Sequence, residues 1–214
     1  MKALEISGTI LGWFEDKEFM ELAVQLRNIS ASPEYKLHLL WQTIGQVRGL
    51  EGLIGEAGVW KGGSAWLLLH RMHRLGIKDK LHLFDTFEGM PAVNPAVDSH
   101  REGDFKDTSM EVVRNRLQGF TNYEMIKGRF PGSAGAYADG KFKWFHVDVD
   151  IYSSVKEACE WVYPRMVPGG LMIFDDYGTR SCAGAKKAVD EFFADKTEAV
   201  LYLPTTQAMV IKHP

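Results

Sequence analysis

Apolar residues in the first fifty positions recur at helical spacing. A weak pattern of this kind runs from Glu18 to Asn28, and a stronger one follows it. The stronger pattern gathers its apolar residues on one buried helix face: Leu37, Leu40, Trp41, Ile44 and Val47. The sequence therefore predicts two helices ahead of the first strand, which form an N-terminal helical cover over residues 1–50.

After residue 50, short apolar runs alternate with amphipathic patterns. The predicted strands are Leu53–Glu56, Leu81–Phe84, Tyr123–Ile126, Phe142–Val149, Leu171–Phe174, Ala199–Leu203 and Ala208–Ile211. The predicted helices between them are Ala65–Leu75, Met110–Leu117, Val155–Tyr163 and Ala185–Phe193. This alternation predicts an α/β fold with a seven-stranded, mostly parallel sheet and helices on both faces. The last two runs are close enough to form an antiparallel C-terminal hairpin.

One segment, Thr86–Asp107, departs from the alternation. It has no apolar periodicity and is rich in Pro, Asp and Gly. Loops of this length in a compact domain are usually lids or disordered. The segment also follows the carboxyl end of a predicted strand, which is where ligands bind in sheets of this kind. We therefore expect it to border a binding site.

Composition fits one globular domain, with the sheet in residues 51–214. The chain has 214 residues, is 45% hydrophobic and carries a formal charge of -3, so it offers no broad cationic surface for nucleic acid or a membrane. Its two cysteines, Cys159 and Cys182, lack the CxxC spacing of zinc sites and predict free thiols in a cytoplasmic protein. We expect a small-molecule partner, and Trp13, Phe14 and Trp41 leave open whether the cover shields a pocket or forms a homodimer surface.

A glycine-rich loop follows the first predicted strand. Glu56 ends that strand, and Gly58 and Gly62 follow it at two and six residues. The loop matches neither the phosphate loop nor the dinucleotide pattern, because Trp60 and Lys61 fill positions where a pyrophosphate needs bare backbone. By itself it could be a connection without a ligand. Asp85, at the end of the second strand, is placed to bind ribose hydroxyls, so together the two acids suggest an adenosine-type ligand.

Two apolar strands end in paired acids, and these carry the clearest chemical signal. Asp148 and Asp150 are two residues apart and would share one side of an extended strand, while Asp175 and Asp176 close the next strand. Converging carboxylates raise one another's pKa and favour a divalent cation, for which oxygen ligands suit Mg²⁺, Mn²⁺ or Ca²⁺ better than zinc. The alternative to a metal site is that these aspartates only cap the N-termini of the helices that follow.

These motifs resemble those of a known family. The glycine loop and second-strand acid are similar to class I S-adenosylmethionine-dependent methyltransferases, and five segments sharpen the likeness: EAGVWKGGSA, LFDTFEGMP, IKGRFPGS, VDVDIYSS and PGGLMIFDDYG. Together they resemble the macrocin-type (TylF-like) O-methyltransferases over about the last three-quarters of the chain. The resemblance implies a Rossmann-like methyltransferase fold and a metal-dependent enzyme that acts on sugar hydroxyls.

The resemblance also implies roles for individual residues. Residues expected to bind S-adenosylmethionine are Glu56, Gly58, Gly62 and Ser64 at the methionine part, Asp85 at the ribose and Gly128 beside the adenine. Trp60 and Phe87, as aromatic residues beside strands, are expected along the same pocket, with packing in the core as the alternative. Asp148, Asp175 and Asp176 would hold the metal, with magnesium as the default. Asp150 would be the catalytic base.

The expected reaction is methylation of a sugar-like or vicinal-diol hydroxyl, which would suit natural-product biosynthesis. The cation would lower the pKa of the reacting hydroxyl while Asp150 takes its proton. Catechol-type relatives place a lysine three residues after the first Asp, where this chain has Ile151, which favours a sugar-like acceptor. Two alternatives stay open: a non-catalytic S-adenosylmethionine-binding or assembly protein, and a metal-dependent sugar transferase. His100 and Arg101 are more simply explained as solvated loop residues.

Overall fold

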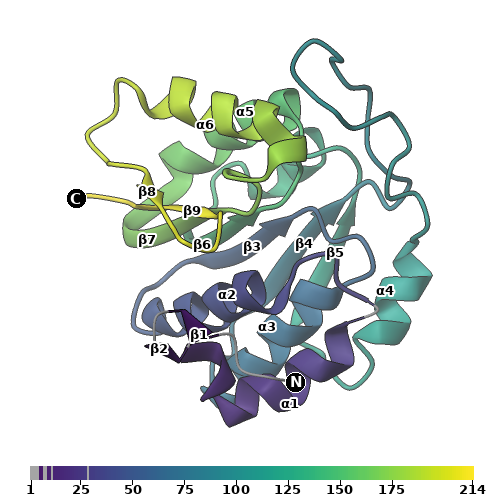
Figure 1. The fold of residues 1–214 in the computed structure, drawn as a ribbon, viewed down its shortest axis with the longest axis vertical. Coiled ribbons are helices and arrows are strands. Elements are labelled where there is room, and N and C mark those ends of the chain that lie inside the picture. Colours follow the sequence, from purple (N-terminus) through teal and green to yellow (C-terminus); the bar gives the residue numbers. More distant parts are fainter. Residues whose placement is uncertain (1–4, 7–8, 11, 28) are drawn as a thin grey trace.

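A seven-stranded sheet organises the molecule. The computed structural model describes residues 5–6, 9–10, 12–27 and 29–214, and its sheet has the order β5-β4-β3-β6-β7-β9-β8 (Figure 1). The strands are β3 (Leu53–Ala57), β4 (Leu81–Asp85), β5 (Tyr123–Lys127), β6 (Phe142–Val147), β7 (Met166–Phe174), β8 (Leu201–Tyr202) and β9 (Ala208–Ile211). Strands β3 to β7 pair in parallel, whereas β9 is antiparallel to β7 and β8. The predicted sheet is confirmed.

Helices cover both faces of this sheet. The α-helices are α1 (Lys17–Leu26), α2 (Glu34–Gln46), α3 (Gly63–Arg74), α4 (Met110–Arg116), α5 (Tyr152–Val162) and α6 (Ala183–Phe193). Short 3₁₀ helices are η1 (Gly12–Phe14), η2 (Gly132–Tyr137), η3 (Tyr163–Arg165) and η4 (Arg180–Cys182), and a separate ribbon pairs β1 (Glu5–Ile6) with β2 (Thr9–Ile10). In Figure 1, α1, α2 and α3 lie on one face and α5 and α6 on the other. Each face has its own apolar core.

The two N-terminal helices belong to the first of these cores. Trp41 of α2 is fully buried, its indole Nε1 donates to Asp16 Oδ2 at 2.9 Å, and the Arg71 guanidinium of α3 lies 4.4 Å from its ring centre. Cation–π contacts of this kind stabilise helix packing. The predicted cover is therefore continuous with the domain it covers. The predicted end of the first helix, Asn28, lies outside the described residues.

The end of β6 differs from its prediction. The apolar pattern predicts a strand to Val149, but β6 stops at Val147. The Asp148 N–H donates to the Ala57 carbonyl at 2.8 Å, and Asp150 adopts a left-handed φ of 57°, which turns the chain away from the sheet. The two acids therefore sit on a strand-end turn rather than on one face of a strand. β7 is longer than predicted, because its first residue, Met166, already pairs with Phe142.

No helix in the described ranges is both long enough and apolar enough to cross a bilayer.

A glycine makes the contact between β3 and the end of β6 possible. Gly58 has φ +89°, and a Cβ built there would lie 1.7 Å from the Asp148 carbonyl oxygen. The atoms in the way belong to the backbone of Asp148, which cannot move aside as a flexible side chain can. The E-x-G spacing of the sequence therefore allows two strand ends to meet at the point where the site forms.

We expect Gly58→Ala to destabilise the protein by at least about 3 kcal/mol, because left-handed strain adds to a clash with backbone. Gly49→Ala is the matched control, since nothing lies within 4 Å of a Cβ at that position. Denaturant unfolding of both variants measures the difference. Equal stability of the two variants would contradict this account of the strand junction.

Candidate active site

A cavity of about 570 Å³ opens at the carboxyl ends of the parallel strands. Residues following β3, β4, β5, β6 and β7 line it, as do the α1–α2 connection and the long loop at 86–107. β3 pairs with β4 on one side and β6 on the other, so the cavity lies where the connections diverge to opposite faces of the sheet. Ligands bind at this switch point in open α/β sheets. The 86–107 loop thus borders the cavity, as its place in the sequence predicted.

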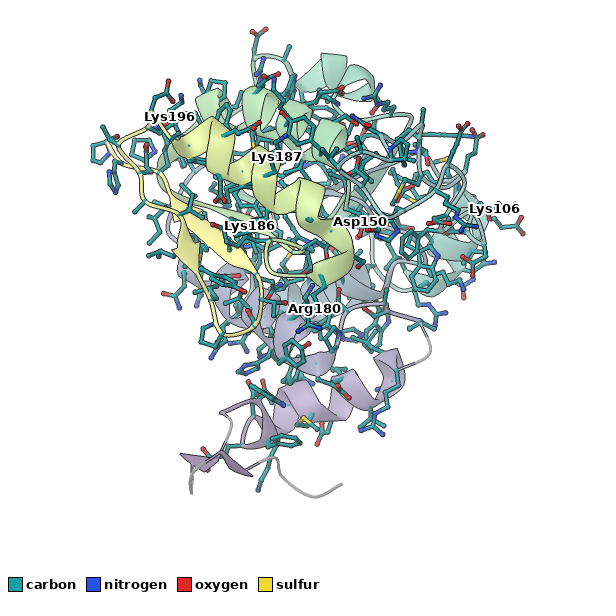
Figure 2. The ribbon with its side chains drawn as sticks, turned by 45° about the horizontal axis from the view of Figure 1, so that its top comes forward. Lys106, Asp150, Arg180, Lys186, Lys187 and Lys196 are labelled. Atoms are coloured by element: carbon teal, nitrogen blue, oxygen red, sulfur yellow. The ribbon has the colours of Figure 1, made fainter. Side chains whose placement is uncertain are left out.

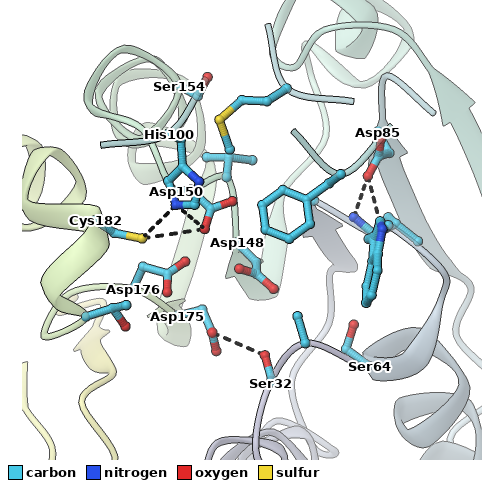
Figure 3. A pocket seen from close by; sticks show the side chains of 18 of the residues that line it. Ser32, Ser64, Asp85, His100, Asp148, Asp150, Ser154, Asp175, Asp176 and Cys182 are labelled. Carbon is cyan, nitrogen blue, oxygen red and sulfur yellow. Dashed lines mark hydrogen bonds and ion pairs between the residues drawn. The ribbon is translucent and has the colours of Figure 1, made fainter. Parts of the chain in front are cut away.

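Asp85 organises the glycine loop. Its Oδ2 accepts the backbone N–H groups of Val59 at 2.6 Å and Trp60 at 2.9 Å (Figure 3). Its Oδ1 accepts the Phe87 N–H at 2.6 Å. Trp60 and Phe87 both have left-handed backbone, with φ of 45° and 53°. A carboxylate offers about four acceptor positions, and beyond these three backbone bonds Asp85 has only a long contact, at 3.4 Å, with the Thr86 hydroxyl, which a ligand hydroxyl can replace. Asp85 thus fixes the strained loop through its backbone N–H groups and also lines the cavity.

The predicted cofactor residues divide into two layers. Those lining the cavity are Gly58, Trp60, Ser64, Asp85 and Gly128. The second layer lies behind this lining: Gly62 precedes α3 in a left-handed conformation, Phe87 is packed in the core, and Glu56 is fully buried. Glu56 Oε2 is buried without a hydrogen-bond partner among the described residues. These three residues therefore support the glycine loop from behind and do not form the cavity surface.

Three of the four predicted acids lie close together in the cavity lining. Carboxylate oxygens of Asp148, Asp150 and Asp176 lie within 4.8 Å of one another. Burial raises the pKa of Asp148 well above its usual range, and the charges of Asp175 and Asp176 raise it further. The pKa of Asp150 is raised in the same way, by burial and then by Asp176. Such a group is stabilised by a cation.

Asp175 has a different environment. Its Oδ2 accepts from Lys36 Nζ at 2.8 Å and Ser32 Oγ at 3.3 Å, and its Oδ1 accepts from Gln207 Nε2 at 2.7 Å and His146 Nε2 at 3.4 Å. Burial alone would raise its pKa, but His146 and Lys36 outweigh that effect and lower the pKa. All four acceptor positions of this carboxylate are therefore in use.

Asp175 is the centre of a buried row of alternating charges. His146 is fully buried, and its Nδ1 donates to Glu56 Oε1 at 2.9 Å while its Nε2 contacts Asp175. Burial opposes the charged imidazolium, but the hydrogen bonds to Asp175 and Glu56 raise the pKa of His146 to about 9. On the other side, Lys36 Nζ also reaches Asp176 Oδ1 at 3.3 Å. The row thus connects the glycine-loop acid with the acid cluster.

The sequence patterns did not indicate Lys36, Ser32, Gln207 or His100 as site residues. Lys36 was detectable in principle, because it is a cation beside the apolar face of a predicted helix, but its partners are more than 130 positions away. His100 has the sequence context of a solvated loop residue, yet its Nε2 lies 3.8 Å from Asp150 Oδ1. Nothing local in the sequence indicates either contact.

The basic side chains Lys36, Arg129 and Arg180 are among those that line the cavity. Figure 2 shows Asp150 near the end of α6, close to Arg180, which lines the cavity. Lys186 and Lys187 lie farther along α6 and pair with Asp190 and Glu191 one turn later. Exposed pairs of this spacing support the helix but contribute little energy.

The fold and site define the class of this protein: it has the Rossmann-like methyltransferase fold, as the resemblance implied. A family model described as Macrocin-O-methyltransferase (TylF) matches residues 34–200, and the chain belongs to that family. The matched range includes Lys36, the glycine loop and all four aspartates.

A curated relative agrees with this assignment. A tetracenomycin enzyme of Streptomyces olivaceus, 8-demethyl-8-(2,3-dimethoxy-alpha-L-rhamnosyl)-tetracenomycin-C 4'-O-methyltransferase, is 30% identical over 149 residues, covering 64% of this chain and 57% of the relative. The chain therefore spans less than two thirds of the length of that relative.

Solved structures support the fold. The O-methyltransferase NovP superposes with a TM-score of 0.73 at 23% identity, over 85% of this chain and 81% of NovP. An O-methyltransferase from Bacillus cereus, solved in complex with SAH, superposes with a TM-score of 0.57 at 16% identity, over 92% and 91% of the two chains.

We expect Lys36→Met to lower the free energy of unfolding by about 3–5 kcal/mol, because it leaves the buried Asp175 carboxylate without its ammonium partner. Lys156→Met, which removes an exposed partner of Glu160, should change stability little. Denaturant unfolding in EDTA compares the two. A Lys36 variant as stable as the Lys156 variant would contradict the importance of the buried row.

The raised pKa of His146 predicts a pH dependence of stability. Its stabilising charge is fully present below the unfolded-state pKa of 6.5 and is lost as the pH rises through about 9. Unfolding free energies of the metal-free protein should therefore fall across this window, and His146→Gln should flatten the fall. His82→Gln is the control, because burial lowers the pKa of His82 out of that window. An unchanged slope in His146→Gln would refute the assignment.

Proposed function

We propose that the protein transfers a methyl group from S-adenosylmethionine to a hydroxyl of a sugar-like or vicinal-diol small molecule, with a divalent cation, Mg²⁺ by default. One observation carries the proposal: the cavity has the glycine loop and Asp85 on one side and the acids Asp148, Asp150 and Asp176 on the other. Family membership supports the same reaction, since the tetracenomycin relative is named as a 4'-O-methyltransferase.

The cofactor side suits a nucleoside joined to an amino acid. Ser64 lies in the first turn of α3 and lines the cavity, where free N–H groups and the helix dipole favour a carboxylate. Asp85 lines the cavity, where a ribose hydroxyl can take the place of the Thr86 hydroxyl, which lies 3.4 Å from Asp85 Oδ1. Gly128, with φ +134°, lets a flat ring approach the backbone. The SAH complex of the Bacillus cereus neighbour supports a ligand of this kind on this fold.

The acid side fits a hard divalent cation. Asp148 and Asp176 supply carboxylate oxygens of the type that Mg²⁺ prefers, and their mutual repulsion favours its binding. Asp175, also predicted as a ligand, already accepts hydrogen bonds on both oxygens, so it can join only by displacing a donor such as Lys36. A bound cation would supply Lewis acidity to a coordinated hydroxyl.

Asp150 is the proposed base. It lies within the same acid group, and its raised pKa brings it closer to the neutral range in which a base is effective. Its left-handed backbone aims the carboxylate into the cavity instead of along the sheet. Asp150 would accept the hydroxyl proton while the hydroxyl oxygen bonds to the methyl carbon and the carbon–sulfur bond breaks, which releases S-adenosylhomocysteine. The cavity would bring the two reactants together.

The test is methyl transfer by the purified chain to a panel of sugars with vicinal hydroxyls, followed by mass spectrometry. Asp150→Asn should lower kcat by about 10²–10⁴ without changing S-adenosylmethionine affinity, because the base acts only on the acceptor. Asp85→Asn should weaken cofactor binding in calorimetry, and EDTA should abolish turnover until Mg²⁺ is restored.

Asp139→Asn, an exposed acid outside the cavity lining, is the control and should behave as wild type. Failure to bind either S-adenosylmethionine or SAH would overturn the proposal. Cofactor binding without transfer to any acceptor would instead favour a binding or assembly protein.

A further inference from the structure

A second group of metal-binding side chains lies beside the acid cluster. His100 comes from the 86–107 loop, Asp150 from the turn after β6, and Cys182 from the residue preceding α6 (Figure 3). Cys182 is 2% exposed, and all three residues line the cavity. Three segments far apart in the sequence thus direct a nitrogen, an oxygen and a sulfur toward one point.

Two of the three distances between these atoms match a tetrahedral zinc site. Cys182 Sγ lies 3.4 Å from His100 Nε2 and 3.6 Å from Asp150 Oδ1, and the nitrogen and oxygen are 3.8 Å apart. With Zn–S bonds of about 2.3 Å and Zn–N or Zn–O bonds of about 2.0–2.2 Å, tetrahedral ligand atoms lie roughly 3.3–3.7 Å from one another. Both sulfur distances fall in this range, and the nitrogen–oxygen distance of 3.8 Å exceeds it slightly, so a bound zinc ion would draw the His100 and Asp150 side chains closer together.

A fourth residue orients the histidine. His100 Nδ1 lies 3.3 Å from Asp104 Oδ2, which in turn accepts the Arg101 N–H at 2.9 Å. A carboxylate bonded to the far nitrogen of a ligating imidazole is a recurring support of zinc sites, because it fixes the tautomer and the ring orientation. Asp104 therefore presents Nε2 of His100 toward Cys182 and Asp150.

We propose that His100, Asp150 and Cys182 form a site for a borderline-soft divalent cation, Zn²⁺, with Asp104 as a positioning residue. The site shares Asp150 with the oxygen-only group of Asp148, Asp150 and Asp176 but differs from it in its other ligands, because a thiol and an imidazole favour zinc over magnesium. On binding, the Cys182 thiol, which otherwise donates to Asp150, loses its proton to solvent and its sulfur ligates the ion. The fourth coordination position faces the cavity.

Occupation of this site would inhibit the enzyme, and this consequence rests on the proposed function. Zinc would engage Asp150, the proposed base, and would tie the 86–107 loop to the sheet through His100. Both effects oppose turnover: the base loses the electron pair that takes the proton, and the loop cannot move aside for the acceptor.

Cobalt(II) titration of the metal-free protein tests the site without relying on activity. Co²⁺ bound by the thiolate should produce a near-ultraviolet sulfur-to-cobalt charge-transfer band and visible ligand-field bands, and Zn²⁺ should remove both. Cys182→Ser should abolish the charge-transfer band. His100→Ala should weaken Co²⁺ binding, and Asp104→Asn should weaken it by about 10–100-fold.

Two control variants separate the possible outcomes. Cys159→Ser removes the other buried thiol, on α5, and should keep the band. Asp148→Asn removes an acid of the neighbouring cluster and should also keep it, because cobalt held only by carboxylates gives no sulfur band. A wild-type protein without a charge-transfer band, or a band that survives in Cys182→Ser, would overturn the zinc site. Zinc inhibition that is equally strong in wild type and Cys182→Ser would overturn its inhibitory role, whereas absence of methyl transfer with the band present would count only against the proposed function.

Discussion

Repulsion among carboxylates at the ends of β6 and β7 is the constraint on which the rest of the site depends. Four aspartates meet there, and a fifth acid, Glu56, is buried behind them. Two buried cations, Lys36 and His146, alternate with the acids along the buried row. Each cation therefore lies between two carboxylates, and no two carboxylates are direct neighbours in the row. Breaking such a buried pair leaves a charge without compensation. The position of α2, which carries Lys36, is thereby linked to the chemistry of the cavity.

Backbone strain gathers at the same place. Trp60, Phe87 and Asp150 all adopt left-handed conformations that side chains rarely occupy, and Asp85 fixes the first two through their N–H groups. Strain of this kind persists only where the surrounding structure determines it, and it is concentrated at functional sites. In this protein the left-handed residues turn the chain sharply after three strands. Side chains near these turns, among them Trp60, Asp85 and Asp150, line the cavity.

The sequence was sufficient for the sheet and for the cavity-facing acids, because both depend on local patterns. Apolar runs predicted every strand of the main sheet, and paired acids at strand ends predicted where charge would gather. Partners from distant segments could not be predicted in this way. Lys36 and His100 reach the acids only through helix packing and the path of a long loop, and neither leaves a periodic signal. Cysteine spacing argued against a zinc site, because it tests only ligands that are close in sequence. Cys182 comes near His100 and Asp150 only in the folded protein.

The hydrogen bonds of Asp175 also tie the acid cluster to the C-terminal hairpin. Ser32 and Lys36 reach Asp175 from the N-terminal side of the sheet, whereas Gln207, in the connection between β8 and β9, follows Asp175 by 32 positions. Because a domain generally folds as a unit, all of these donors reach Asp175 only in the complete fold. A chain cut short before Gln207 would leave the buried Asp175 carboxylate without one of its donors.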